Sequence, residues 1–175
     1  KVFWPEKKIT KGELIDYYSC VSGYILPHIE NRPISMNRYP DGIYGKHFYH
    51  KDYDGKQPSW LKSVQIRSDE KDINYLLCQN TSSLLFLINL GCIDLNPWLS
   101  TIKELDSPSY CVIDLDPLDI EFSYVCQTAL AAYEIMKRYG IKGYPKTSGA
   151  TGMHIYIPLQ PGYSYQDSKN FAYII

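Results

Sequence analysis

The sequence predicts an α+β fold in which mixed β-sheets are flanked by helices. Two kinds of segment indicate this fold class. Short apolar or alternating runs bounded by turn residues, such as 64–67, 92–95 and 110–116, are typical of strands. Residues 120–139 instead repeat apolar side chains at helical spacing and end in two basic residues and a glycine, as helix C-termini often do.

The composition is that of a globular protein with one sizeable core or two small lobes, because 45% of the 175 residues are hydrophobic and 21% are charged. The longest apolar run, 84–88, is too short to span a membrane, and the opening residues do not form a secretory signal. Five scattered cysteines without a C-x-x-C pair favour reduced thiols over disulfides or zinc. We therefore expect a cytoplasmic protein with no membrane partner.

Charge is distributed unevenly along the chain. Residues 1–67 carry eleven Lys/Arg and seven Asp/Glu, a balance of +4, whereas residues 68–175 carry seven and twelve, a balance of −5. A basic part beside an acidic part suits a site that holds a polyanion over a cation. Seventeen tyrosines could supply base-stacking faces, although we expect most of them to pack half-buried.

The N-terminal segment predicts a helix and an anion site. Thr10 and Glu13 have capping-box spacing, so we expect a helix from Lys11 to about Cys20. Its free N–H groups and Lys11 in its first turn would bind phosphate, and Lys1, Lys7 and Lys8 could contribute from the preceding loop. A solvated lysine face is the alternative interpretation.

Residues 34–49 predict a hairpin that turns at Pro40-Asp41-Gly42, after a loop between Pro27 and Pro33. Its rim carries Arg38, Lys46, Phe48 and Tyr49. Because Phe48 and Tyr49 are adjacent, we expect one ring in the core and the other free to stack on a base.

The middle of the chain predicts an exposed connection over 51–62, a strand over 64–67 and a mostly buried helix that starts near Tyr75 and stops at Gly91. A further strand, 92–95, would end at Asn96-Pro97.

Residues Tyr110–Pro117 carry the chemistry. The apolar run 111–113 predicts a strand that proline stops, and Asp114 and Asp116 then point to the same side, about 6–7 Å apart at their roots. Two such carboxylates repel each other unless a cation lies between them, and oxygen ligands suit Mg²⁺ or Mn²⁺. The alternative is an Asp-Pro turn without function.

A strand over 141–144 and the turn 146–152 follow the helix expected over 120–139. Two glycines let main-chain N–H groups approach an anion, and Ser148 adds a donor. His154 then lies on the polar face of a strand that reaches Pro158 and could donate to a phosphate oxygen; a histidine satisfied by a neighbour is the alternative. We expect this turn and the acid pair to meet around the same ions and nucleotide.

In three stretches the sequence resembles the polymerase (primase-like) domain of prokaryotic DNA ligase D: Val112-Ile-Asp-Leu-Asp-Pro117, Thr147-Ser-Gly-x-x-Gly-Met-His154, and Lys1-Val-Phe-Trp-Pro with Thr10-Lys11. That domain belongs to the archaeo-eukaryotic primase superfamily and serves end joining. The resemblance covers the whole chain. It implies a single primase-polymerase domain, 1–175, with a basic DNA-binding part (1–105) and a metal and nucleotide part (106–175).

The resemblance also implies roles for individual residues. Asp114 and Asp116 would hold two Mn²⁺ or Mg²⁺ ions and catalyse transfer. The nucleoside triphosphate would be bound by Ser148, Gly149, Thr151, His154, Asn96 and Arg38. Lys1 and Lys11 would grip a 5′-phosphate, and Phe48 and Tyr49 would pack against template bases.

The chain departs from the family pattern at three places. Many relatives have His where Asn96 stands, and relatives often have Lys where Thr151 stands. The third metal aspartate of the family lies on a later strand, for which Asp167 is a poor substitute in its loop-like segment. We therefore expect a piece of a longer protein, truncated before its last catalytic strand.

Three functions follow as hypotheses. The first is a template-dependent nucleotidyltransferase that adds (ribo)nucleotides to a 3′ end at gaps or breaks during non-homologous end joining. The alternative is a non-catalytic DNA-end-binding module that recognises a 5′-phosphate, and a metal-dependent phosphoesterase is the third. Expected partners are DNA with gaps or 3′ overhangs, nucleoside triphosphates, the end-joining ligase and Ku.

Overall fold

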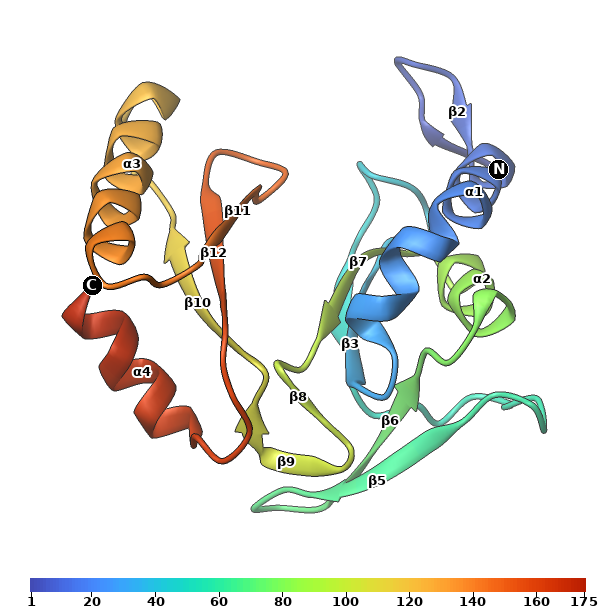
Figure 1. Cartoon of the computed structure of the whole chain (residues 1–175). Helices are drawn as coiled ribbons and strands as arrows, with labels where there is room; N and C mark the ends of the chain where they lie inside the picture. The colour runs from blue at the N-terminus through green and yellow to red at the C-terminus, as the bar shows by residue number, and fades with distance from the viewer. The chain divides into compact units, whose positions relative to one another are not determined.

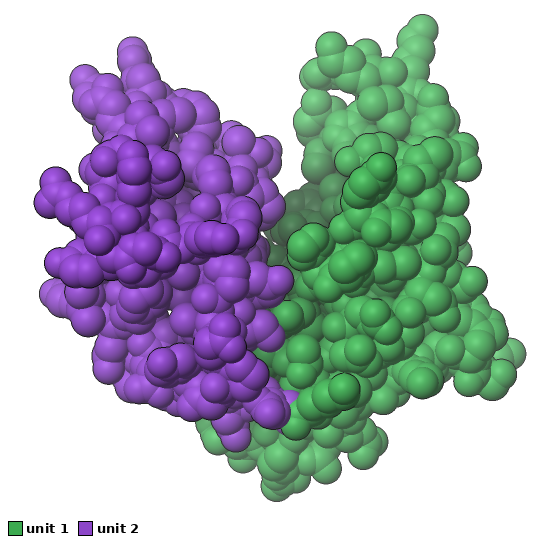
Figure 2. All heavy atoms as spheres, viewed as in Figure 1, with its two compact units in different colours: residues 1–103 green, residues 104–175 purple.

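The computed structural model describes all residues, 1–175, and divides into two units, Lys1–Lys103 and Glu104–Ile175 (Figure 2). Each unit has its own apolar core and its own sheet. None of the four helices is long and apolar enough to cross a membrane.

Strand β3 (Pro33–Arg38) is the centre of the sheet in the first unit (Figure 1). It pairs with β7 (Cys92–Pro97), with β4 (Phe48–His50) and with β6 (Asp72–Leu77), and β6 pairs in turn with β5 (Ser63–Arg67). All of these pairings are antiparallel. The hairpin predicted from residues 34–49 is therefore present, with β4 at an edge.

Two helices and two short N-terminal strands also belong to the first unit. Helix α1 (Lys11–Ile29) and helix α2 (Thr81–Asn89) pack on the core built from β3, and β1 (Val2–Trp4) pairs with β2 (Ile9–Thr10). The predicted capping box forms: the Glu13 carboxylate accepts from Thr10 N–H at 2.8 Å, and Thr10 Oγ accepts from Glu13 N–H at 3.2 Å.

The predicted helices and connections of this unit differ from the structure at three places. Helix α1 continues through Pro27, because a proline in the last turn removes only one late hydrogen bond and the Glu30 N–H still reaches the Leu26 carbonyl at 2.9 Å. Residues 75–77 belong to strand β6, which β5 and β3 hold on both edges. The connection 51–62 is not wholly exposed, since Tyr53 and Leu61 are buried.

The second unit has the antiparallel strand order β10-β12-β11, with β10 (Tyr110–Leu115), β12 (Met153–Pro158) and β11 (Tyr144–Thr147). Helix α3 (Phe122–Arg138) joins β10 to β11, so β12 is inserted between two parallel strands as in a split β-α-β unit. Helices α3 and α4 (Tyr165–Ile174) cover one face of this sheet (Figure 1). The other face carries Asp114 and His154.

Two boundaries in the second unit differ from the prediction. Strand β11 begins at Tyr144, because residues 140–141 close helix α3: Gly140 has φ +68° and the Ile141 N–H bonds to the Met136 carbonyl at 2.9 Å. Asp167 lies in the first turn of α4, where its carboxylate accepts from Ser164 N–H at 2.9 Å. A hairpin of β8 (Ser100–Thr101) and β9 (Glu104–Pro108) links the two units along the chain.

Candidate active site

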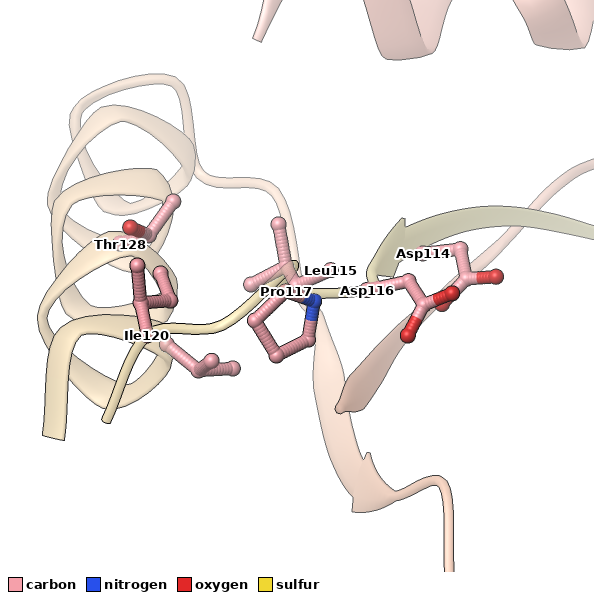
Figure 3. Close-up of a pocket in the computed structure, with 7 residues that line it drawn as sticks. Asp114, Leu115, Asp116, Pro117, Ile120 and Thr128 are labelled. Atoms are coloured by element: carbon pink, nitrogen blue, oxygen red, sulfur yellow. The ribbon is translucent and has the colours of Figure 1, made fainter. Parts of the chain in front are cut away.

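The acid pair occupies the end of strand β10. Asp114 is in the strand, Asp116 follows it, and Leu115 between them packs on the core of the second unit. Figure 3 shows both carboxylates on the same side of the chain. The Asp114 side chain is 61% exposed, and the Asp116 carboxylate makes no hydrogen bond or ion pair. Two open carboxylates without a lysine or arginine partner form a site that attracts a cation.

His154 lies directly across from Asp114 in the register of β10 and β12. Its Nε2 atom is 3.5 Å from Asp114 Oδ1, and its buried Nδ1 atom has no hydrogen-bond partner. Ile155 and Ile157 point to the opposite face and are 3% and 2% exposed, as the alternating pattern predicts. The structure thus brings the acid pair and the histidine together on one face of one sheet.

The glycine-rich turn closes between Ser148 and Gly152. The Ser148 N–H donates to the Gly152 carbonyl at 2.9 Å, and the Gly152 N–H donates to Ser148 Oγ at 3.0 Å. Ser148 Oγ also accepts from the Ala150 N–H at 3.4 Å. The serine therefore organises the turn with its oxygen, while its O–H and the amides of Gly149 and Thr151 stay free to donate to an anion.

Gly152 ties this turn to the acid pair. A Cβ atom at Gly152 would lie 2.5 Å from the Leu115 carbonyl oxygen and 3.4 Å from Asp116 Cα. The turn therefore packs against the main chain that carries the two aspartates, and only glycine allows this approach.

A hollow of about 280 Å³ opens beside the acid pair, between the residues after β10 and the start of α3 (Figure 3). Asp114 and Asp116 line it together with the apolar residues Leu115, Ile120 and Val125, and their carboxylates point away from Ile120 and Thr128. No third His, Cys, Asp or Glu in the chain joins the pair as a metal-binding group of three. The donor set of this unit for a cation is therefore the two carboxylates.

A cationic cluster lies at the N-terminus of α1 in the first unit. The Lys11 N–H bonds to the Lys1 carbonyl at 2.8 Å, and Lys1 Nζ is 2.6 Å from Asp41 Oδ1. Partial burial, followed by the positive charges of Lys1 and Arg38, lowers the pKa of the Lys11 ammonium below its usual value. Crowded positive charge at a helix N-terminus is relieved when an anion binds.

The family model described as "LigD, primase-polymerase domain" matches residues 10–175. The chain belongs to this family. The resemblance seen in the three motifs is confirmed.

The matched relatives are end-joining proteins. The chain is 33% identical over 177 residues to the bifunctional non-homologous end joining protein LigD of Bacillus subtilis, covering 100% of this chain and 28% of that protein. It is 28% identical over 162 residues to the multifunctional LigD of Mycolicibacterium smegmatis, covering 91% and 21%. The chain therefore spans about a quarter of the length of these curated relatives.

The fold also matches a solved LigD structure. The polymerase domain from Mycobacterium tuberculosis ligase D, in complex with DNA, aligns with a TM-score of 0.80 and 25% identity, covering 92% of this chain and 60% of that chain. The α+β primase-polymerase fold predicted from the sequence is confirmed.

The aromatic pair of this LigD-family domain lies on edge strand β4. Phe48 and Tyr49 are 44% and 64% exposed, so the expectation that one of them enters the core is wrong. Strand β4 has only three residues and one neighbour, so both rings stay outside the core at this edge. Arg38 lies 5.3 Å from the Phe48 ring centroid and bonds to the Leu90 carbonyl at 2.9 Å and to His50 Nδ1 at 2.9 Å.

Two further residues predicted to bind nucleotide, Asn96 and Thr151, make few or no contacts with the other predicted site residues. Asn96 is half-buried on β7, and its side-chain amide donates to the Asp94 carbonyl at 3.3 Å. Thr151 is exposed in the turn beside His154. Asn96 and Arg38 belong to the first unit, and Thr151 to the second.

Sequence reasoning missed two side chains on the face that carries the acid pair. Lys146 pairs with His154 in the register of β11 and β12, and Tyr144 pairs with Tyr156. The Tyr156 ring centroid lies 6.3 Å from that of His154, and burial, the Asp114 charge and neighbouring Tyr110 raise the pKa of the Tyr156 phenol. Period-2 spacing of residues 144, 146, 154 and 156 was the available signal, but it depended on knowing that 144–147 is a strand.

Proposed function

We propose that this chain is a template-dependent nucleotidyltransferase that adds nucleotides, in particular ribonucleotides, to a 3′ end at gaps or breaks during non-homologous end joining. One observation carries the proposal. Asp114 pairs in register with His154, and Gly152 holds the anion-binding turn against the same two aspartates. The membership in the LigD primase-polymerase family supports it.

The residues fit a divalent ion. Asp114 and Asp116 present oxygen atoms to one side, are exposed and have no lysine or arginine to neutralise them. When bound there, Mg²⁺ or Mn²⁺ would lower the pKa of the 3′-hydroxyl and neutralise charge on the departing pyrophosphate. The protein then has to hold the triphosphate in line with that hydroxyl.

The second unit supplies groups for this positioning. Ser148 O–H and the amides of Gly149 and Thr151 would donate to phosphate oxygens, and His154 would add an imidazole N–H.

The first unit would bind DNA. We assign the 5′-phosphate of a gapped or overhanging end to Lys1, Lys11 and the N-terminus of α1, and template bases to Phe48 and Tyr49. The M. tuberculosis polymerase domain, which shares this fold, was solved in complex with DNA. We propose further that the protein acts on DNA in the cytoplasm together with an end-joining ligase and Ku.

Substitution of the first aspartate tests the chemistry. The full-length protein is incubated with Mn²⁺, a gapped duplex carrying a 5′-phosphate, and each nucleotide set, and products are resolved on a gel. Asp114→Ala should abolish nucleotide addition and leave duplex affinity within about two-fold, because the exposed side chain contributes little to folding. Asp106→Ala removes an exposed acid elsewhere in the same unit and should leave both unchanged. Extension by Asp114→Ala would refute the metal role.

A second function, a non-catalytic DNA-end-binding module, is favoured by one observation: the lowered pKa of Lys11 within its cationic cluster. It predicts phosphate-dependent DNA binding without nucleotide addition by the wild type. In either function Lys11→Ala should remove the preference for a 5′-phosphate over a 5′-hydroxyl. Equal wild-type affinity for the two ends would reject the phosphate site.

A further inference from the structure

Strand β11 places one lysine on the face of the sheet that carries the acid pair. Lys146 is the register partner of His154 on β12, and His154 is the register partner of Asp114 on β10. Directly opposed residues of neighbouring antiparallel strands share a face. Carboxylate, imidazole and ammonium therefore stand in one row across three strands.

The Lys146 ammonium is free to bind an anion. The side chain is exposed, it has no carboxylate partner, and Nζ donates to the Thr147 carbonyl at 3.1 Å. That contact brings the cation to the residue next to the Ser148–Gly152 turn. The free amides of the turn and the Lys146 ammonium are thus donors within the same short segment.

We infer that Lys146 binds the terminal phosphates of the nucleoside triphosphate, an inference that rests on the proposed function above. Neighbouring strands are about 4.8 Å apart, so Lys146 begins about 10 Å from Asp114, with His154 between them. A polyphosphate held near the acid pair runs along this row past the imidazole to the ammonium. Along the row from β10 to β11 the side chains change from a carboxylate, which attracts a cation, to an ammonium, which attracts an anion.

The alternative source of phosphate is the DNA backbone, and nucleotide binding distinguishes the two. The position of Lys146 in the row of the acid pair favours the triphosphate. If Lys146 binds the triphosphate, the affinity lost on substituting Lys146 depends on the number of phosphates in a free nucleotide. If Lys146 binds the DNA backbone, the substitution weakens DNA binding alone.

The test compares ATP, ADP and AMP binding by isothermal titration calorimetry in Mg²⁺, using full-length protein. Lys146→Ala should weaken ATP binding by about ten-fold or more, the effect of losing one charge-assisted hydrogen bond, and change AMP binding by less than about two-fold. Lys146→Arg should restore most of the ATP affinity. Lys142→Ala, which removes an exposed lysine near the end of α3, should match the wild type.

Two results would overturn the assignment of Lys146 and leave the proposed function standing. The proposed function is tested separately, by nucleotide incorporation in the gel assay. One is Lys146→Ala binding ATP as the wild type does, and the other is an equal loss of ATP and AMP affinity. Weakened DNA binding with unchanged ATP affinity would assign Lys146 to the backbone instead. A wild-type protein that neither binds ATP nor incorporates nucleotides would overturn both.

Discussion

Gly152→Ala is the substitution that most directly tests how the turn and the acid pair are joined. An ordinary contact distance is 3.4 Å or more, and the new methyl group would lie 2.5 Å from the Leu115 carbonyl oxygen, so one main chain must move by about 0.9 Å. Overpacking of this kind costs about 1–3 kcal/mol of folding free energy. A displacement near 1 Å at reacting groups lowers a rate by about 100-fold.

Urea unfolding followed by circular dichroism measures the first effect, and nucleotide addition the second. The matched control is Gly23→Ala in helix α1, where a Cβ meets nothing within 4 Å and the change should stabilise the protein by about 0.5–1 kcal/mol. Unchanged stability and unchanged addition in Gly152→Ala would show that this contact does not set the spacing of the site.

Three further predictions concern the first unit. Asp41→Asn frees Lys1 from an exposed ion pair worth about 0–1 kcal/mol, so the ratio of affinities for 5′-phosphate and 5′-hydroxyl ends should rise, by up to about five-fold; a fall would contradict the assignment. Because the pKa of Lys11 is lowered in the free protein and a bound phosphate raises it, phosphate-dependent affinity should be full at neutral pH and decline at alkaline pH, whereas Lys11→Arg should show a smaller decline. Asn80→Ala removes the cap that accepts from the Ser83 N–H at 2.9 Å and should lower the unfolding free energy by about 1 kcal/mol in urea titrations; no change would show that the cap is dispensable.

Capping and turn residues predicted those elements whose ends they determine locally. The capping box at Thr10, the Schellman geometry at Gly140 and the hairpin turn near Asp41 all form as their residue types require. Strand β6 was predicted as helix because a short apolar run has no decisive period, and its partners lie on either side in the fold. Asn80 followed by Ser83 was the missed sign that the helix begins after it.

The candidate site was predictable to a similar extent. Asp114 and His154 could be placed near each other because each follows from an alternating strand, and the family resemblance paired them. Lys146 could not be found this way, because its position depends on the register between β11 and β12. The environment of Lys11 likewise depends on Lys1 and Arg38, which only the folded first unit brings near it.

The apolar face of the second unit determines which side chains meet on its polar face. Shifting β12 by one residue against β10 would move His154 to the core and bring Ile155 to the acid pair. Ile155 and Ile157 are almost fully buried, and exposing both side chains would cost about 3–6 kcal/mol. A slip would also replace Gly152, at its close approach to the Leu115 carbonyl, by a residue that carries a Cβ atom. The register that aligns carboxylate, imidazole and ammonium is therefore held by residues that never touch a substrate.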